Sequence, residues 1–117
     1  MNLAEIADIV GLENLTPEID LEATPDITSG YASDLLSDVL AHAPRGGVLI
    51  TVQVHLTVIA VSLRAELPAI IFSLGRKPDA ATRDKAAEEG ICLLASSQPA
   101  FEIVGKLYEL GLRGVKT

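Results

Sequence analysis

Residues 46–73 read GGVLITVQVHLTVIAVSLRAELPAIIFS, and this stretch decides the fold. A glycine pair opens it, and a short apolar run follows at residues 48–51. A longer apolar run occupies residues 55–63, and a run rich in β-branched side chains follows Pro68. The pattern predicts a strand, a helix and a second strand. Because the helix offers almost no polar face, we expect both of its neighbours to cover it.

The same rhythm continues to the end of the chain. Residues 80–89 predict a helix that Asp79 caps, residues 91–95 predict a third apolar strand, and a last helix begins at Pro99. Residues 112–117 are expected to form a frayed tail. Apolar strands that alternate with helices are typical of a parallel sheet covered on both faces. The sequence therefore predicts an α/β fold, a three-layer α/β/α sandwich with a parallel or mixed sheet.

The first third of the chain does not follow this rhythm, and we expect it to supply an edge strand and a flanking helix. Residues 2–11 predict a short amphipathic helix that Asn2 caps and Gly11 ends. A short strand is predicted at residues 12–16. A half-exposed strand is predicted at residues 19–23, where apolar and acidic residues alternate.

A further helix is predicted at residues 34–43, with Ser33 or Asp34 as its cap. Asp34 and Asp38 would then lie on one helix face as solvated acids near the positive end of the helix dipole. The predicted buried face consists of Leu35, Leu36, Val39 and Leu40.

The composition limits the class of protein. The chain has 117 residues, of which 49% are hydrophobic and only 3% aromatic. These values predict a single domain, residues 1–117, with an aliphatic core. An aliphatic surplus in so short a chain favours self-association, and we expect a homodimer. The net charge of −7 argues against nucleic acid and against an anionic membrane as partners.

The location of the protein is also predicted from its composition. Cys92 is the one cysteine, which excludes an intrachain disulfide and is typical of a reducing compartment. The N-terminus lacks the basic region of a signal peptide, and no apolar run approaches the roughly 18 residues of a membrane span. We therefore expect a cytoplasmic protein.

Polar side chains follow each of the three apolar strands, and ligands usually bind beyond the carboxyl ends of parallel strands. These loops offer hydroxyls, an amide, an imidazole and two cations at the starts of helices, which suits a small anionic metabolite. The alternative is that the same side chains only cap helices, since strand-end loops are polar in most α/β proteins. The candidate ligand-binding residues are Thr51, Gln53, His55, Ser73, Gly75, Arg76, Lys77, Ser96 and Ser97.

Several catalytic and cofactor motifs are missing from the sequence. It contains neither a G-x-x-x-x-G-K-[ST] nor a G-x-G-x-x-G phosphate loop, and no G-x-S-x-G nucleophile turn. His42, His55 and Cys92 do not have the spacing of metal ligands. We therefore expect no enzymatic activity, no cofactor and no metal site. A small enzyme that acts at the strand-end loops remains a weaker alternative.

Four segments resemble the DRTGG-domain family: residues 30–40, 49–55, 75–79 and 101–108. The resemblance covers roughly residues 26–110 and is spread out along the chain. It implies a fold akin to the non-catalytic N-terminal domain of HPr kinase/phosphorylase and to the N-terminal domains of Mur ligases. The central domain of long phosphotransacetylases belongs to the same family.

The resemblance implies a regulatory or scaffold module, often dimeric and without catalytic activity. An adaptor for a redox complex of the hydrogenase type, or for a kinase complex, is the alternative that it suggests. The pentapeptide that gives the family its name is absent, and Val54 and His55 stand where its Asp-Arg pair would fall. Any role of that acid–base pair is therefore not carried over to this chain.

Overall fold

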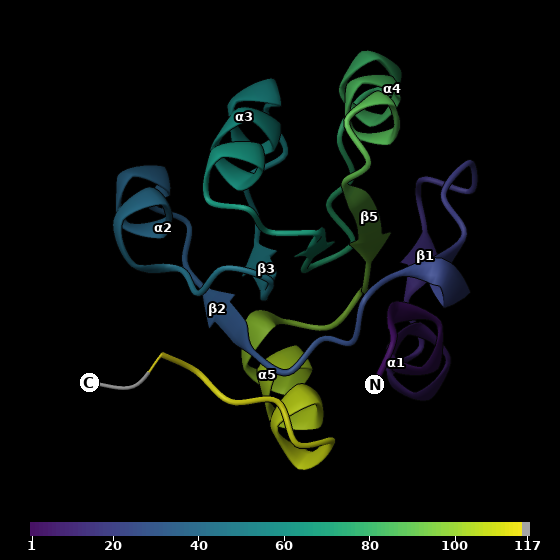
Figure 1. Ribbon diagram of the computed structural model, residues 1–117, viewed down its shortest axis with the longest axis vertical. Coiled ribbons are helices and arrows are strands. Elements are labelled where there is room, and N and C mark those ends of the chain that lie inside the picture. Colours follow the sequence, from purple (N-terminus) through teal and green to yellow (C-terminus); the bar gives the residue numbers. More distant parts are fainter. Residues whose placement is uncertain (116–117) are drawn as a thin grey trace.

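The computed structural model describes residues 1–115. Its centre is a five-stranded mixed sheet with the strand order β1-β5-β4-β3-β2 (Figure 1). Four strands run parallel, and β1 pairs with β5 in the antiparallel direction. The strands are β1 (Glu13–Asn14), β2 (Gly30–Ala32), β3 (Val48–Thr51), β4 (Ala69–Phe72) and β5 (Cys92–Ala95). The first third of the chain thus supplies both edge strands, where the sequence predicted one.

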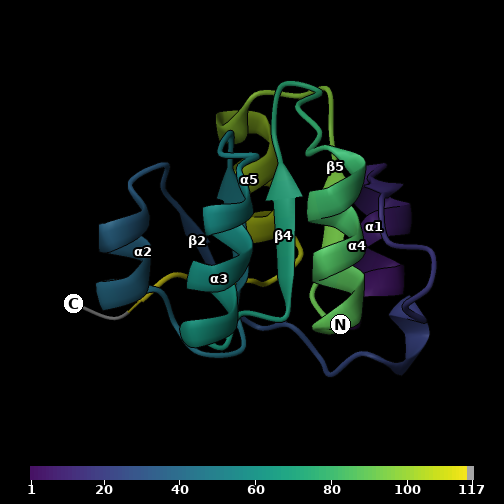
Figure 2. The same ribbon diagram turned by 90° about the horizontal axis from the view of Figure 1, so that it is seen from above.

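Helices cover both faces of this sheet. Figure 2 looks onto one layer, in which α2 (Leu36–His42), α3 (Leu56–Arg64) and α4 (Ala80–Glu88) lie side by side. On the opposite face lie α1 (Leu3–Val10) and α5 (Ala100–Glu109) (Figure 1). The predicted three-layer α/β/α sandwich with a mixed sheet is therefore confirmed.

The two halves of the core follow from alternation along the buried strands. Side chains that face the α2–α4 layer include Leu49, Ile70 and Phe72. Their neighbours in sequence, such as Ile50 and Ile71, face α1 and α5. Every residue of β3, β4 and β5 is buried, as expected for strands covered on both faces.

The predicted caps of two helices, α1 and α4, are confirmed. Asn2 caps α1 with a side-chain bond from the Glu5 amide, and the Glu5 carboxylate accepts in return from the Asn2 amide. Asp79 caps α4 by accepting from the Thr82 amide at 2.8 Å. Both helices therefore begin where the sequence predicts.

The expected covering of α3 is only partial: α2 and α4 both pack against it, but they leave its outer side open (Figure 2). Val58 and Ile59 are buried against the sheet, but Leu56 is 49% exposed and Leu63 is 46% exposed. The reason is that α3 belongs to an outer layer, so the sheet covers one of its sides and its outer side meets solvent. An apolar helix sequence alone does not reveal this.

The strand predicted at residues 19–23 is also wrong, because this segment contains the short 3-10 helix η1 (Leu21–Ala23). Asp20 caps it by accepting from the Glu22 amide at 3.0 Å, and the Thr24 hydroxyl donates to the Leu21 carbonyl at 2.6 Å. Ile19 and Leu21 pack against the core next to α1. The alternation of apolar residues therefore reflects a turn that rests on the core.

The helix predicted at residues 34–43 is shorter, Leu36–His42. The Ser33 hydroxyl accepts from the Leu35 amide at 3.2 Å, but neither Ser33 nor Asp34 occupies the cap position, which is Leu35. Because Asp34 precedes the helix, it does not share a helix face with Asp38.

Most of the buried face predicted for this helix is likewise wrong. Val39 alone is fully buried, whereas Leu36 is half-buried. Leu35 is 65% exposed and Leu40 is 44% exposed. The helix lies over the end of the sheet at β2 and β3, so only a narrow strip of it meets the core (Figure 1).

The frayed tail predicted for residues 112–117 is wrong at its start. Leu112 is buried, and the Arg113 amide donates to the Thr28 carbonyl at 3.1 Å. The Gly30 amide donates in turn to the Arg113 carbonyl at 3.0 Å. Arg113 is thereby held against the outer edge of β2, while residues 116–117 lie outside the described part.

Candidate functional site

The carboxyl ends of β3, β4 and β5 meet at one edge of the sheet. Thr51 ends β3, Ser73 follows β4 and Ser96 follows β5. The Ser73 amide donates to the Thr51 carbonyl at 3.1 Å, and the Ser96 amide donates to the Phe72 carbonyl at 2.9 Å. The strand-end rule therefore places the three predicted loops side by side, as expected.

The three hydroxyls at this edge are buried and mostly serve the turns. The Thr51 hydroxyl donates to Asp34 at 2.8 Å and accepts from the Gln53 amide at 3.1 Å. The Ser96 hydroxyl accepts from the Gln98 amide at 3.1 Å. The Ser73 hydroxyl is buried and has no hydrogen-bond partner within residues 1–115. Thr51 and Ser96 thus act as turn residues.

Beside this edge lies an open cleft of about 680 Å³ between the start of α3 and the first turns of α4. It brings together three of the predicted residues, Gln53, His55 and Arg76. Sequence reasoning missed Asp79 and Lys85, which also line it. The sequence did place Asp79 near this site, because it predicts Asp79 as the cap of the helix that follows the second loop.

The other predicted residues do not line the cleft. Gly75 takes a left-handed conformation with φ of 67° and donates from its amide to the Ser96 carbonyl at 2.8 Å, so it shapes the loop. Lys77 forms an ion pair with Glu13, with Nζ–O distances of 2.8 and 3.0 Å, and so fastens this loop to β1. Ser97 is exposed and does not belong to the cleft lining.

The charged side chains of the cleft differ in whether they already bind another group of the chain. Hydrogen bonds from the Thr82 amide and hydroxyl lower the pKa of Asp79, and the nearby His55 adds a smaller lowering. A hydrogen bond to Glu89, at 3.0 Å, raises the pKa of Lys85. Arg76 is exposed and takes part in no ion pair with residues 1–115. Arg76 is therefore the cation of the cleft that is available to a ligand.

His55 occupies the cap position of α3, but its side chain makes no capping hydrogen bond. Its Nδ1 lies 3.5 Å from the Thr57 hydroxyl, at the limit of a hydrogen bond. The Gln53 side-chain amide donates to the Asp34 carbonyl at 2.9 Å, which fixes its position at the rim. One firm cation, an imidazole and an amide at a helix start can bind a small anion.

A second polar cluster, which sequence reasoning missed, joins β2 to α2. The Tyr31 hydroxyl donates to Asp38 at 2.8 Å, and His42 Nδ1 lies 3.1 Å from the other Asp38 oxygen. The bond from Tyr31 is the main cause that lowers the pKa of Asp38, and the same bond raises the pKa of Tyr31. This cluster fastens the helix to the edge strand.

The part of the chain that the structure describes contains neither a metal-binding cluster nor a membrane-spanning helix. Residues 1–115 hold no group of three His, Cys, Asp or Glu side chains that could bind a metal ion. None of the helices described is long and apolar enough to span a membrane.

No family model matches the sequence, and no curated protein matches it. The fold, by contrast, is similar to a solved structure, the CBS and DRTGG domains of the regulatory region of Clostridium perfringens pyrophosphatase in complex with the activator diadenosine tetraphosphate. The TM-score is 0.73 at 13% sequence identity. The likeness covers 91% of this chain and 45% of that chain, so this chain spans less than half of that regulatory region.

At this identity the likeness concerns the fold alone. It agrees with the resemblance read from the sequence, in which segments from residue 30 onward are similar to the DRTGG family. The expected fold is thereby confirmed: the chain has a DRTGG-like α/β fold, of the kind found in the regulatory region of a pyrophosphatase.

Proposed function

We propose that the chain is a non-catalytic regulatory domain that self-associates and binds a small anionic ligand in the cleft between α3 and α4. The observation that carries the proposal is the open cleft of about 680 Å³, lined by Gln53, His55 and Arg76. Arg76 supplies a positive charge that forms no ion pair within the described range, although the Asp79 carboxylate lines the same cleft. The start of α3 adds a positive dipole end to the same side.

The chemistry of the cleft favours an anion with an organic part. Leu56 and Ala81 line the cleft together with the polar residues, so its wall is partly apolar. A phosphate would lie near Arg76 and the start of α3, and a ring or sugar would lie along the apolar wall. A nucleotide phosphate fits this description, and the structural neighbour is itself in complex with a dinucleotide polyphosphate activator.

The experiment is titration calorimetry of the full chain with four probes: diadenosine tetraphosphate, ATP, AMP and inorganic phosphate. We expect at least one nucleotide to bind and Arg76→Gln to weaken its binding about 10-fold, which corresponds to roughly 1.4 kcal/mol for one charged hydrogen bond. Arg64→Gln is the matched control, because Arg64 is an exposed cation at the far end of α3 and lies outside the cleft lining.

Binding should also weaken as the salt concentration rises, because ions screen an exposed cation. If none of the four probes bound, or if Arg76→Gln and Arg64→Gln had equal affinity, the cleft residues would be ordinary helix caps. The adaptor alternative would then be the better description of the chain.

A further inference from the structure

Helix α5 carries a stripe of residues that stay largely exposed within residues 1–115. Phe101 is 86% exposed, Tyr108 is 56% exposed and Val104 is 36% exposed. Together with Gly105 they follow the spacing i, i+3, i+4, i+7, which places all four on one side of the helix. Ile103 and Leu107, which point to the sheet, are fully buried.

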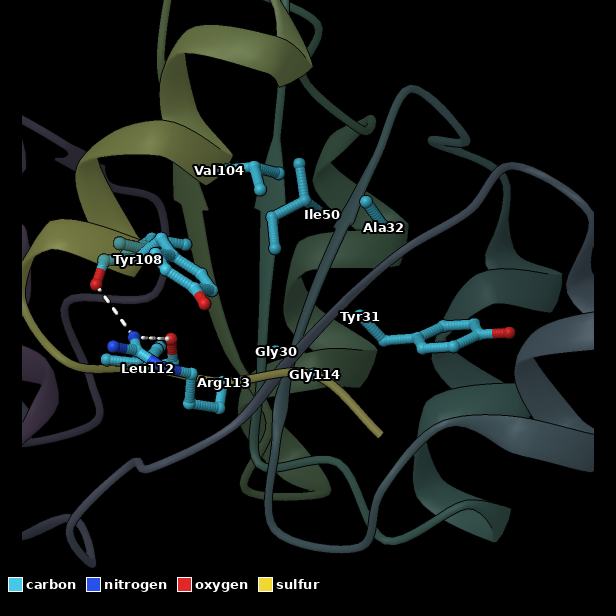
Figure 3. A pocket seen from close by; sticks show the side chains of 10 residues that line it. Gly30, Tyr31, Ala32, Ile50, Val104, Tyr108, Leu112, Arg113 and Gly114 are labelled. Atoms are coloured by element: carbon cyan, nitrogen blue, oxygen red, sulfur yellow. Dashed lines mark hydrogen bonds between the residues drawn. The ribbon is translucent and has the colours of Figure 1, made fainter. Parts of the chain in front are cut away.

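The stripe borders the edge of the sheet at β2. An opening of about 100 Å³ lies between α5 and β2, and Figure 3 shows Val104 and Tyr108 on its helix side and Ala32 on its strand side. Its lining is mostly apolar, with Gly30, Ile50 and Leu112 among the remaining members. The Arg113 guanidinium stacks on the Tyr108 ring at 3.8 Å from the ring centre and closes one end.

Gly105 lies in the middle of this stripe, and nothing in its own chain requires a glycine there. It is helical, its φ is not positive, and a Cβ atom added to it would meet no atom within 4 Å. Glycine inside a helix is roughly 0.5–1 kcal/mol less favourable than alanine. A glycine on an exposed helix face does, however, let a second helix approach closely.

We propose that this stripe is the dimer interface: two copies pack their α5 helices antiparallel across a two-fold axis that passes near Val104 and Gly105. The inference rests on the proposed self-association and names its surface. An antiparallel pair centred between residues 104 and 105 brings Phe101 level with the partner's Tyr108. The Phe101 ring then enters the opening between α5 and β2 of the partner subunit, and the partner's Phe101 does the same in return.

The available area agrees with a stable dimer. A specific interface buries roughly 800 Å² on each partner. At their exposures, Phe101 and Tyr108 together present on the order of 250 Å², since buried aromatic side chains cover roughly 150–250 Å² each. The two rings thus supply about a third of the required area as an apolar centre. The other exposed residues of α5 and the residues that line the opening beside β2 are available for the rim.

The first test is sedimentation of wild type and Gly105→Leu over a concentration series. Leucine has a higher helix propensity than glycine, and an added Cβ atom meets no atom of residues 1–115 within 4 Å, so we expect the variant to keep its fold and its thermal stability. We expect wild type to be dimeric at about 10 µM and Gly105→Leu to dissociate at least about 100-fold more readily. Ala60→Leu, at an exposed position of α3, is the matched control and should remain dimeric.

The second test is oxidation of Val104→Cys, which places a thiol beside the two-fold axis. The native Cys92 does not interfere, because it is 1% exposed and burial raises the pKa of its thiol to about 11. We expect a disulfide-linked dimer from Val104→Cys and none from Leu63→Cys, a control on the opposite helix layer.

A dimer that survives Gly105→Leu and gives no Val104→Cys disulfide would overturn the α5 interface and leave self-association intact. Wild type that remains monomeric at about 100 µM would overturn both, while the calorimetric titration of the cleft reports on ligand binding separately.

Discussion

Asp34 accepts a hydrogen bond from the Thr51 hydroxyl at 2.8 Å, and this bond joins the end of β3 to the segment before α2. The same carboxylate oxygen accepts from the Val52 amide at 2.9 Å. The Gln53 side chain donates to the Asp34 carbonyl at 2.9 Å. A residue that the sequence suggests as a helix cap therefore braces the loop that carries Gln53 and His55 into the cleft.

Replacing Asp34 should loosen the loop that follows β3. Asp34→Ala removes the acceptor of two hydrogen bonds, and we expect it to lower the free energy of unfolding by about 1 kcal/mol, the size of a partly exposed hydrogen bond. It should also weaken ligand binding in the cleft. Urea denaturation measures the first effect, with Asp8→Ala on α1 as the control. Equal stability of the two variants would show that the brace contributes nothing.

The Tyr31–Asp38 bond should make stability depend on pH in a predictable way. The pKa of Asp38 is lowered from its ordinary value of 3.8, so its contribution is present above that pH and is lost as the pH falls through the lower folded value. The pKa of Tyr31 is raised from 10.0, so its contribution is present below pH 10.0 and is lost as the pH rises through the higher folded value.

The variant that tests this is Tyr31→Phe, compared with wild type by urea denaturation at several pH values. We expect the stability difference to be largest between the two ordinary values and to shrink in more acidic and in more alkaline solution. Tyr108→Phe, whose ring lies on the exposed side of α5, is the control. A difference that stayed constant over the whole pH range would contradict this account.

The exposure of α2 predicts which apolar residues matter for stability. Phe72→Ala at the end of β4 should cost about 3–5 kcal/mol, because it leaves a cavity in a closed core. Leu35→Ala and Leu40→Ala should each change stability by less than about 0.5 kcal/mol, since both side chains are largely exposed. Chemical denaturation of the three variants checks this. A cost above about 2 kcal/mol at Leu35 would mean that α2 is covered.

The cleft should bind without turnover. Three side chains of the cleft are suited to acid–base chemistry: His55, Asp79 and Lys85. Asp79 is engaged as the cap of α4, and the hydrogen bonds that lower its pKa make it a weak base, while Lys85 is paired with Glu89. Incubation with ATP or diadenosine tetraphosphate should release no more phosphate than a heat-inactivated sample does. Turnover that is abolished in Arg76→Gln would show instead that the cleft is an active site.

Local residue patterns predict much of this fold. The alternation from Val48 onward was predicted because each strand is an apolar run and each boundary carries its own signal, such as Asp79 before α4. Residues 19–23 were misread because three alternating apolar residues fit a strand and a core-packed turn equally well. The place of Leu112 depends on the pairing of Arg113 with Thr28 and Gly30, a long-range contact that no local pattern contains.

The sequence predicted part of the candidate site, namely three of the residues that line the cleft. The strand-end rule selected Gln53, His55 and Arg76, because parallel strands bring their following loops to one edge. It could not separate them from Thr51 and Ser96, whose hydroxyls turn inward to the loops. Lys85 was missed because its place in the cleft depends on which side of α4 faces α3.

The measurement that tests the central claim most directly is a titration of the isotope-labelled full chain followed by NMR, with diadenosine tetraphosphate as the probe and sodium sulfate at equal ionic strength as the control. If the α3–α4 cleft is the anion site, the amide signals that shift should be those of residues 53–56, 76–77 and 79–82, and Arg76→Gln should suppress the shifts. Shifts confined to β2 and α5, or no shifts with the nucleotide beyond those with sulfate, would contradict the claim.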